Sequence, residues 1–151
     1  MRLSRRILFP LGAAALLGFC GAAAAKTVTL SGTFAGEHGT PQHPTGTVDA
    51  TLDTDTHRLD YTIDYSGLSG PVTVAHFHGP AGAGTEAGAL QPIDGPYASG
   101  MHRTVTVDAA TQAAMLKGMS YVNLHTKAFP KGEARAQLTV AEPAAADAGG
   151  M

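Results

Sequence analysis

The chain has 151 residues, with ten lysines and arginines against twelve aspartates and glutamates, and a formal net charge of −2 when histidine is neutral. This length fits one domain, and the lack of a cationic excess argues against binding of DNA or RNA through a basic surface. The single cysteine, Cys20, excludes an intramolecular disulfide. With so little cysteine, the seven histidines are the main soft metal ligands available.

The first 25 residues have the pattern of a cleavable export signal. Arg2, Arg5 and Arg6 precede a short apolar run over residues 7–19, and an alanine run ends at Ala25. The apolar run is shorter than the roughly 20 residues that span a bilayer, so we predict no membrane span. We expect cleavage near Ala25 and an exported protein, periplasmic or secreted.

The export route has two alternatives. Ser4-Arg5-Arg6 resembles a twin-arginine signal, which would export the domain already folded. Cys20 would become a lipid-modified N-terminus if the signal were of the lipoprotein type. The bulky Phe19 directly before that cysteine is unfavourable for lipid attachment, so ordinary cleavage is the preferred interpretation.

Removal of residues 1–25 would leave a domain over 26–140 and a tail over 141–151. The mature part keeps seven cations and all twelve carboxylates, which gives a net charge of −5. The tail is rich in alanine and has no periodic apolar face, so we expect it to be disordered.

The domain is predicted to be all-β, an antiparallel Greek-key sandwich or barrel with one short helix. Apolar and polar residues alternate with period two, most strictly over 58–65, where Leu59, Tyr61 and Ile63 share a face. A short helix is expected over 109–117, begun by Asp108. Residues 37–46 and the glycine-rich segment 79–100 are predicted as loops. The predicted strands cover 27–34, 47–53, 58–65, 72–77, 103–107, 121–126 and 133–140.

The strongest candidate for chemistry is the pair His76 and His78. Residues two apart on a strand point to the same face, with Cα atoms about 6.5 Å apart, so two imidazoles can converge on one metal ion. His125 ends another predicted strand in a similar way. The alternative is structural: these rings would hydrogen-bond to carbonyls and tie the 79–100 loop and the 127–132 turn in place.

The remaining histidines carry weaker signals. His38, His43 and His57 lie in predicted loops or turns, and we interpret them as solvated. His102 stands beside Met101, a pairing that suits copper, and is a possible additional ligand.

Three blocks of this sequence resemble the CHRD domain, named after chordin, over roughly residues 27–140. The blocks are Ala75-His76-Phe77-His78-Gly79-Pro80-Ala81, then Tyr121-Val122-Asn123-Leu124-His125-Thr126, then Gly132-Glu133-Ala134-Arg135-Ala136-Gln137-Leu138. The resemblance implies a secreted single-domain form, and it implies the fold more directly than a function.

CHRD domains in turn resemble Cu/Zn superoxide dismutases, and that similarity implies roles for particular residues. It makes His76, His78 and His125 copper ligands and Arg135 a residue that attracts a small anion such as superoxide. Lys127 and Lys131 would add positive potential. The 79–100 loop contains no histidine, so a zinc subsite is not expected, and His102 could supply a fourth copper ligand.

Two functions therefore stand side by side. The first is an exported protein that binds a single copper ion through histidines, in copper handling or superoxide defence. The second is a non-catalytic extracytoplasmic binding module, a role for which chordin gives a precedent by resemblance. The partners expected are a metal ion and, in superoxide defence, a small anion such as superoxide, and the identity of any protein partner is unknown.

Overall fold

The computed structural model describes residues 26–141, so the expected export signal and all of the expected tail beyond Ala141 lie outside the described residues. Eight strands and one helix form this part of the chain. They are β1 (Thr27–Gly36), β2 (Thr45–Asp53), β3 (Arg58–Ser66), β4 (Val72–His78), β5 (Ala89–Ile93), β6 (Met101–Thr106), α1 (Ala109–Leu116), β7 (Ser120–Thr126) and β8 (Ala134–Val140).

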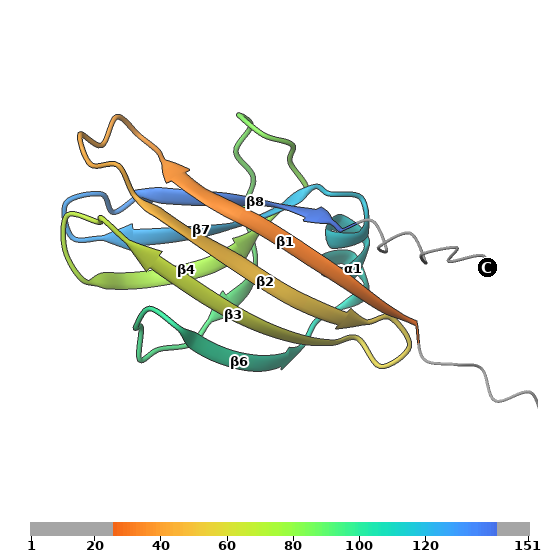
Figure 1. Ribbon diagram of the computed structural model, residues 1–151. Helices are drawn as coiled ribbons and strands as arrows, with labels where there is room; N and C mark the ends of the chain where they lie inside the picture. Colours follow the sequence, from red (N-terminus) through yellow and green to blue (C-terminus); the bar gives the residue numbers. More distant parts are fainter. Residues whose placement is uncertain (1–25, 142–151) are drawn as a thin grey trace, which may run out of the picture.

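The strands form one antiparallel sheet in the order β5-β4-β7-β8-β1-β2-β3-β6, which curls into a half-open barrel (Figure 1). β8 joins the two halves, since it pairs with β7 on one side and β1 on the other. A Cβ at Gly32 would lie 2.6 Å from the carbonyl oxygen of Gln137, so this close approach of β1 and β8 requires glycine. The predicted all-β antiparallel architecture is confirmed.

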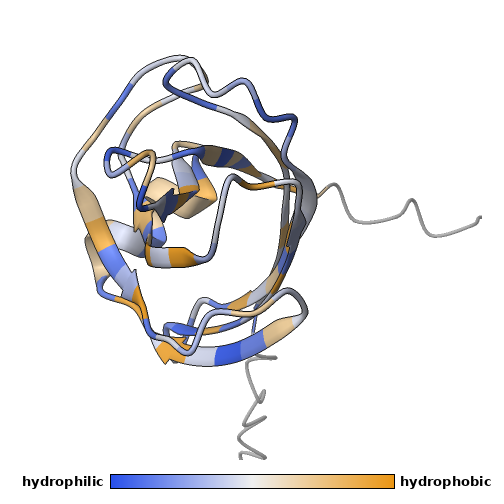
Figure 2. Cartoon of the chain, turned by 90° about the vertical axis from the view of Figure 1, so that its left-hand side faces the viewer, coloured by the Kyte–Doolittle hydropathy of each residue, from blue (hydrophilic) through white to orange (hydrophobic). Residues whose placement is uncertain are grey.

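The barrel encloses one apolar core built from the inward positions of each strand. In β3, Leu59, Tyr61 and Ile63 are buried, as their alternation predicts. The same alternation of hydrophobic and hydrophilic residues follows the curled sheet in the view along the barrel (Figure 2). The rings of Tyr61 and Phe77 meet edge to face, 5.1 Å apart, and so connect β3 to β4 across the core.

α1 lies at the end of the barrel where β1 begins and β8 ends (Figure 1). The carboxylate of Asp108 accepts a hydrogen bond of 2.7 Å from the backbone N–H of Thr111 and so begins the helix as predicted. Met115 is fully buried against the core. None of the helices in the described range has the length and apolar character needed to cross a membrane.

The prediction of an unbroken loop over 79–100 is wrong in one respect. Residues Ala89–Ile93 form β5, which pairs antiparallel with β4. Pro92 has no N–H to donate and weakens the strand signal in the sequence, but β5 is an edge strand and needs partners on one side only. The loop that follows β4 is therefore shorter, from Gly79 to Gly88, and we call it the β4–β5 loop.

Candidate metal centre

The pairing of β4 with β7 places three histidines on the outer face of the sheet. Phe77 is fully buried in the core, so its neighbours His76 and His78 must face outward. In the antiparallel register His76 stands opposite Asn123, and Val74 stands opposite His125. His125 therefore projects from β7 on the same face as the β4 pair.

The three imidazoles come together as a group. One possible ligand atom from each of His76, His78 and His125 lies within 4.8 Å of the other two. The ring centroids are 5.5 Å apart for His76 and His78, 5.6 Å for His76 and His125, and 6.3 Å for His78 and His125. Three nitrogens at about 2 Å from one ion are about 3.4 Å apart, so a small side-chain adjustment would complete such a site.

Two of the rings are oriented by backbone carbonyls. Nδ1 of His78 lies 2.9 Å from the carbonyl oxygen of Ala87, and Nδ1 of His125 lies 2.9 Å from that of Pro130. Because a carbonyl oxygen can only accept, Nδ1 of each ring carries the proton and Nε2 keeps its lone pair. Metal-binding histidines commonly have this arrangement, with the second ring nitrogen fixed by a hydrogen bond.

The remaining nitrogens are buried and unpaired. His76 Nδ1, His78 Nε2 and His125 Nε2 have no hydrogen-bond partner among the described residues. A buried polar atom without a partner is unfavourable, and three of them in one cluster are unusual. Burial lowers the pKa of His76, and the neighbouring His78 and His125 lower it further, so the neutral ring that metal binding requires is favoured.

Tyr121 supports the His78 side of this group. Its ring is stacked on the His78 ring, with centroids 5.0 Å apart and planes inclined by 7°. Its hydroxyl donates to the carbonyl oxygen of Ala87 at 3.2 Å and accepts from the N–H of Ala87 at 3.0 Å. The sequence places Tyr121 on the face of His125, but nothing in it reveals the contact with Ala87.

The expectation that Arg135 attracts anions does not match the surroundings of this side chain. Arg135 is only 9% exposed, and its guanidinium donates to the carbonyl oxygens of Thr85 at 2.8 Å and Gly82 at 2.9 Å. It also stacks on Tyr121, 3.5 Å from the ring centroid, and lies 3.7 Å from a carboxylate oxygen of Glu37. Arg135 thus fixes the β4–β5 loop through its hydrogen bonds to Thr85 and Gly82.

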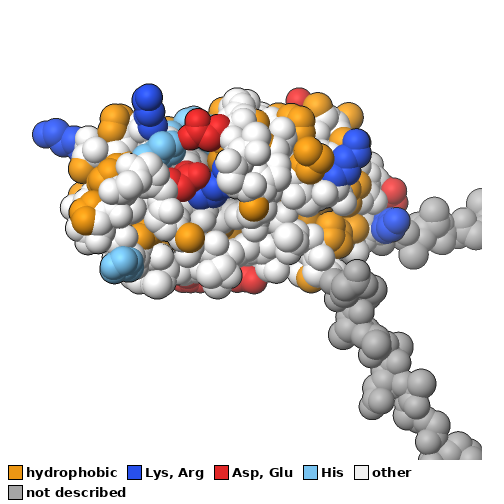
Figure 3. Space-filling view, turned by 90° about the horizontal axis from the view of Figure 1, so that it is seen from above, with side chains coloured by type: hydrophobic (Ala, Val, Ile, Leu, Met, Phe, Trp, Pro, Cys, Tyr) orange, Lys and Arg blue, Asp and Glu red, His pale blue; other side chains and the backbone are white. Residues whose placement is uncertain are grey.

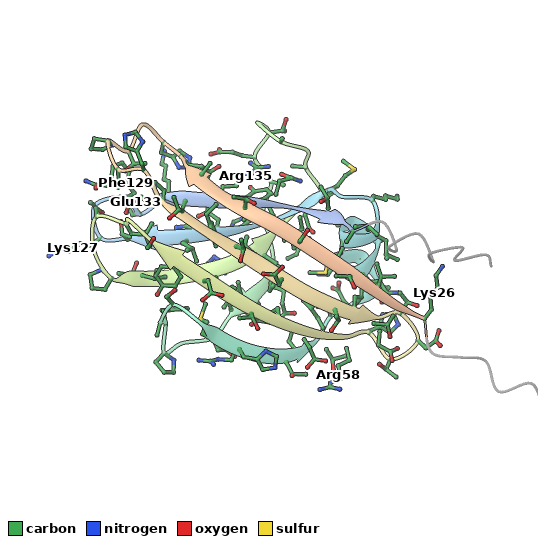
Figure 4. The ribbon with its side chains drawn as sticks, viewed as in Figure 1. Lys26, Arg58, Lys127, Phe129, Glu133 and Arg135 are labelled. Carbon is green, nitrogen blue, oxygen red and sulfur yellow. The ribbon has the colours of Figure 1, made fainter. Side chains whose placement is uncertain are left out.

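A buried carboxylate supports the His125 side. Glu133 is fully buried, and its oxygens accept hydrogen bonds from Ser69 Oγ at 2.7 Å, Thr126 Oγ1 at 2.6 Å, Thr40 Oγ1 at 3.1 Å and the N–H of Ser69 at 2.9 Å. Burial raises the pKa of Glu133, but these donors outweigh it and hold the pKa below its usual value. Figure 4 shows Glu133 and Phe129 together at this end of the barrel.

The other candidate histidines lie apart from the group. His102 is exposed on β6, where its Nδ1 is 3.1 Å from Thr62 Oγ1, and it is not among the three histidines that converge. Met101 is buried, so the two side chains face opposite sides of β6 and cannot share a metal ion. His102 therefore does not complete the site as a fourth ligand.

His38 is exposed, as interpreted from the sequence, but both nitrogens of its ring have partners. Its Nδ1 lies 2.7 Å from the carbonyl oxygen of Gly132 and its Nε2 lies 2.6 Å from Glu86. The hydrogen bond with Glu86, followed by that with Gly132, raises the pKa of His38. His43 is exposed as expected, while His57 is partly buried in the turn between β2 and β3.

A small polar cavity of about 290 Å³ adjoins the group, and His78 forms part of its wall. Its other lining residues are Glu37, Glu86, Ala87, Tyr121, Asn123 and Lys131. The cavity therefore carries charges of both signs, and acidic, basic and histidine side chains gather on this face of the molecule (Figure 3). Lys127 projects away from the end of the barrel (Figure 4), whereas Lys131 lines the cavity beside His78.

The comparisons with known proteins identify the family. A family model for the CHRD domain matches residues 26–138, which cover most of the chain and all three histidines of the group. No curated protein and no solved structure matches this chain, so the expected likeness to Cu/Zn superoxide dismutases has no support from these comparisons. The matched range shows that the chain belongs to the CHRD-domain family.

Proposed function

We propose that this protein binds a single copper ion through His76 Nδ1, His78 Nε2 and His125 Nε2. The observation that supports the proposal is the set of three buried imidazole nitrogens on one cluster of rings, none of which has a hydrogen-bond partner among the described residues. A metal ion would satisfy all three lone pairs at once. The carbonyl contacts of His78 and His125 already select the tautomers that binding needs.

The donor set favours copper. Three neutral imidazoles suit Cu(I) in a trigonal arrangement, or Cu(II) with added water, and copper stands above the other first-row divalent ions in affinity for nitrogen ligands. Zinc with three histidines and one open position is the chemical competitor. Hard ions such as Mg²⁺ and Ca²⁺ prefer oxygen ligands, and no carboxylate belongs to the converging group.

The alternative function, a binding module with structural histidines, accounts for part of the geometry. The contacts of His78 with Ala87 and of His125 with Pro130 are the hydrogen bonds that this alternative predicts. It leaves the second nitrogen of each ring unexplained, because a purely structural histidine gains nothing from a buried, unpaired Nε2. The copper proposal accounts for both nitrogens.

Within the copper proposal, we favour metal handling by an exported protein over superoxide chemistry. Superoxide is an anion, and a positive surface would speed its approach to the metal. The guanidinium of Arg135 is committed to loop carbonyls, and the adjoining cavity has two glutamates against one lysine. Binding and release of a copper ion make no such demand on the surface.

The proposal is tested by titrating the metal-free protein over 26–151 with Cu(I) against a chelator of known affinity, and with Cu(II) by calorimetry. We expect one equivalent to bind and the melting temperature to rise, because a ligand that binds only the folded state stabilises it. His78→Ala and His125→Ala should each weaken binding by at least about 100-fold through the loss of one of three ligands.

His102→Ala is the matched control, since it removes an exposed histidine outside the group. It should bind copper like the unaltered protein. The proposal would be wrong if the unaltered protein bound no copper tightly, or if His102→Ala lowered the affinity as much as His125→Ala did. A dismutase assay on the loaded protein then separates metal handling from superoxide chemistry.

A further inference from the structure

We infer that Tyr121 is a positioning residue of the metal centre, which acts on His78 through the backbone of Ala87. The inference rests on the copper proposal above and assigns a further residue to that same site. Tyr121 acts on the His78 ring in two ways. Its phenol ring stacks on the His78 ring, and its hydroxyl donates to the Ala87 carbonyl that accepts the hydrogen bond of His78 Nδ1.

The carbonyl of Ala87 needs such support because of where it lies. It belongs to the β4–β5 loop, in which Gly82, Gly84 and Gly88 are all exposed. Glycines leave a backbone free to sample many conformations. The corresponding acceptor of His125, the carbonyl of Pro130, lies instead in a turn closed by backbone hydrogen bonds of Thr126 and Phe129 at 3.1 and 3.3 Å.

The β4–β5 loop has backbone hydrogen bonds from Gly79 to Gly88 and from Thr85 to Gly82, each of 3.2 Å, but neither of them involves Ala87, and the phenol hydroxyl of Tyr121 holds that residue instead. It accepts from the N–H of Ala87 at 3.0 Å and donates to the carbonyl of the same residue at 3.2 Å, so it fixes one peptide unit on both sides. That carbonyl is then held at 2.9 Å from His78 Nδ1. The ring orientation that presents Nε2 to the metal depends on this chain of contacts.

Tyr121 is itself held firmly. The His78 ring and the guanidinium of Arg135 are both too close to its centroid, at 5.0 and 3.5 Å, to share one face, so they lie on opposite faces of the phenol. Tyr121 is 3% exposed and stands opposite His78 in the strand register. A side chain clamped between an arginine and a histidine loses little further entropy when it positions a ligand.

The decisive variant is Tyr121→Phe, which keeps the ring and its stack and removes only the hydroxyl. We expect copper affinity to fall by about 10-fold or more, in line with other residues that orient a metal ligand. The stoichiometry should remain one. The electron paramagnetic resonance spectrum of the Cu(II) form should also change its g values and hyperfine splitting, because the His78 ring can turn.

Tyr97→Phe is the matched control. The hydroxyl of Tyr97 also donates to a backbone carbonyl, that of Ile93 at 2.9 Å. Its hydrogen bond holds a segment other than the one that contacts His78. This variant should leave the affinity and the spectrum unchanged, while the two variants lower the melting temperature by similar amounts.

The outcomes separate the two claims. If the unaltered protein binds no copper, the proposed function and this inference fail together. If the unaltered protein binds one copper ion, and Tyr121→Phe matches Tyr97→Phe in affinity and spectrum, the inference alone is overturned and Tyr121 has only a structural role.

Discussion

The buried carboxylate of Glu133 provides a sharp test of how the loops beside His125 are held. Its four hydrogen-bond donors come from Ser69, Thr126 and Thr40, which lie in or beside three different connections of the chain. Glu133→Gln keeps the shape of the side chain and removes its charge. The glutamine side chain can still accept two of the four hydrogen bonds through its amide oxygen. Its NH₂ group can donate to the hydroxyls that made the other two.

The size of the effect follows from the hydrogen bonds. A bond to a charged group contributes about 1 kcal/mol more than a neutral one, so four of them represent about 4 kcal/mol. The neutral glutamine no longer has the cost of a buried charge, and this offsets part of the lost hydrogen-bond energy. We therefore expect Glu133→Gln to lower the free energy of unfolding by about 2 to 3 kcal/mol at pH 7.

The pH dependence gives the effect its signature. The pKa of Glu133 is lowered in the folded state, so its charge stabilises the fold above the unfolded pKa of about 4.3. That contribution is lost as the pH falls through the still lower pKa of the folded state. The gap between the unaltered protein and Glu133→Gln should therefore close below about pH 4.

Urea unfolding at pH 7, 5 and 3 measures this gap, with Asp55→Asn as the control. Asp55 is an exposed aspartate in the turn between β2 and β3, so loss of its charge should have a much smaller effect at each pH. The reasoning would be refuted if Glu133→Gln were as stable as the unaltered protein at pH 7, or if its deficit persisted unchanged at pH 3.

Three further outcomes are expected. Arg135→Met should speed amide hydrogen exchange throughout the β4–β5 loop and lower the free energy of unfolding by about 2 to 4 kcal/mol, because two carbonyls lose their donor. Unchanged exchange in this loop would contradict the role of Arg135 in fixing it. Gly132→Ala should lower the free energy of unfolding by about 3 kcal/mol, because φ at this position is +118° and a Cβ would overlap Asn123 Oδ1. A melting temperature equal to that of the unaltered protein would contradict this expectation. Because the pKa of His38 is raised, its contact with Glu86 stabilises the fold fully below about pH 6.5 and is lost as the pH rises through the raised value. Glu86→Gln should remove that dependence between pH 5.5 and 8.5, and a melting profile identical to that of the unaltered protein would argue against it.

The architecture was accessible from the sequence because the strand signal is local. The alternation in β3 predicts which of Leu59, Tyr61 and Ile63 face the core, and the turn residues mark most strand ends. β5 escaped because Pro92 and the surrounding glycines have the composition of a loop. Only pairing with β4, a contact outside the segment itself, makes it a strand.

The convergence of the three histidines could be predicted from the sequence, and the contacts that orient their rings could not. The spacing of His76 and His78 requires that both face one side of β4, and the position of His125 at a strand end suggested the third ring. The contacts of Tyr121 with Ala87 and of Arg135 with Thr85 join segments more than 30 residues apart. Sequence patterns carry no signal for such contacts.

Arg135 shows that a residue of a family block can have a structural role that the sequence does not reveal. The block that contains it marks the family, and each of its polar members has a structural partner. Glu133 accepts hydrogen bonds from the hydroxyls of Ser69 and Thr126, and Arg135 fixes the β4–β5 loop. Gln137 donates to the carbonyls of Ala81 at 2.9 Å and Gly118 at 3.1 Å. The block thus contributes to the fold around the histidines through each of these three side chains.

The central claim is that three specified nitrogens bind one copper ion. Its most direct test is a crystal of the protein loaded with one equivalent of copper, measured at the copper absorption edge. We predict a single strong anomalous peak about 2 Å from His76 Nδ1, His78 Nε2 and His125 Nε2. A crystal with no peak there, or with its strongest peak at His102 or another histidine outside the group, would contradict the account.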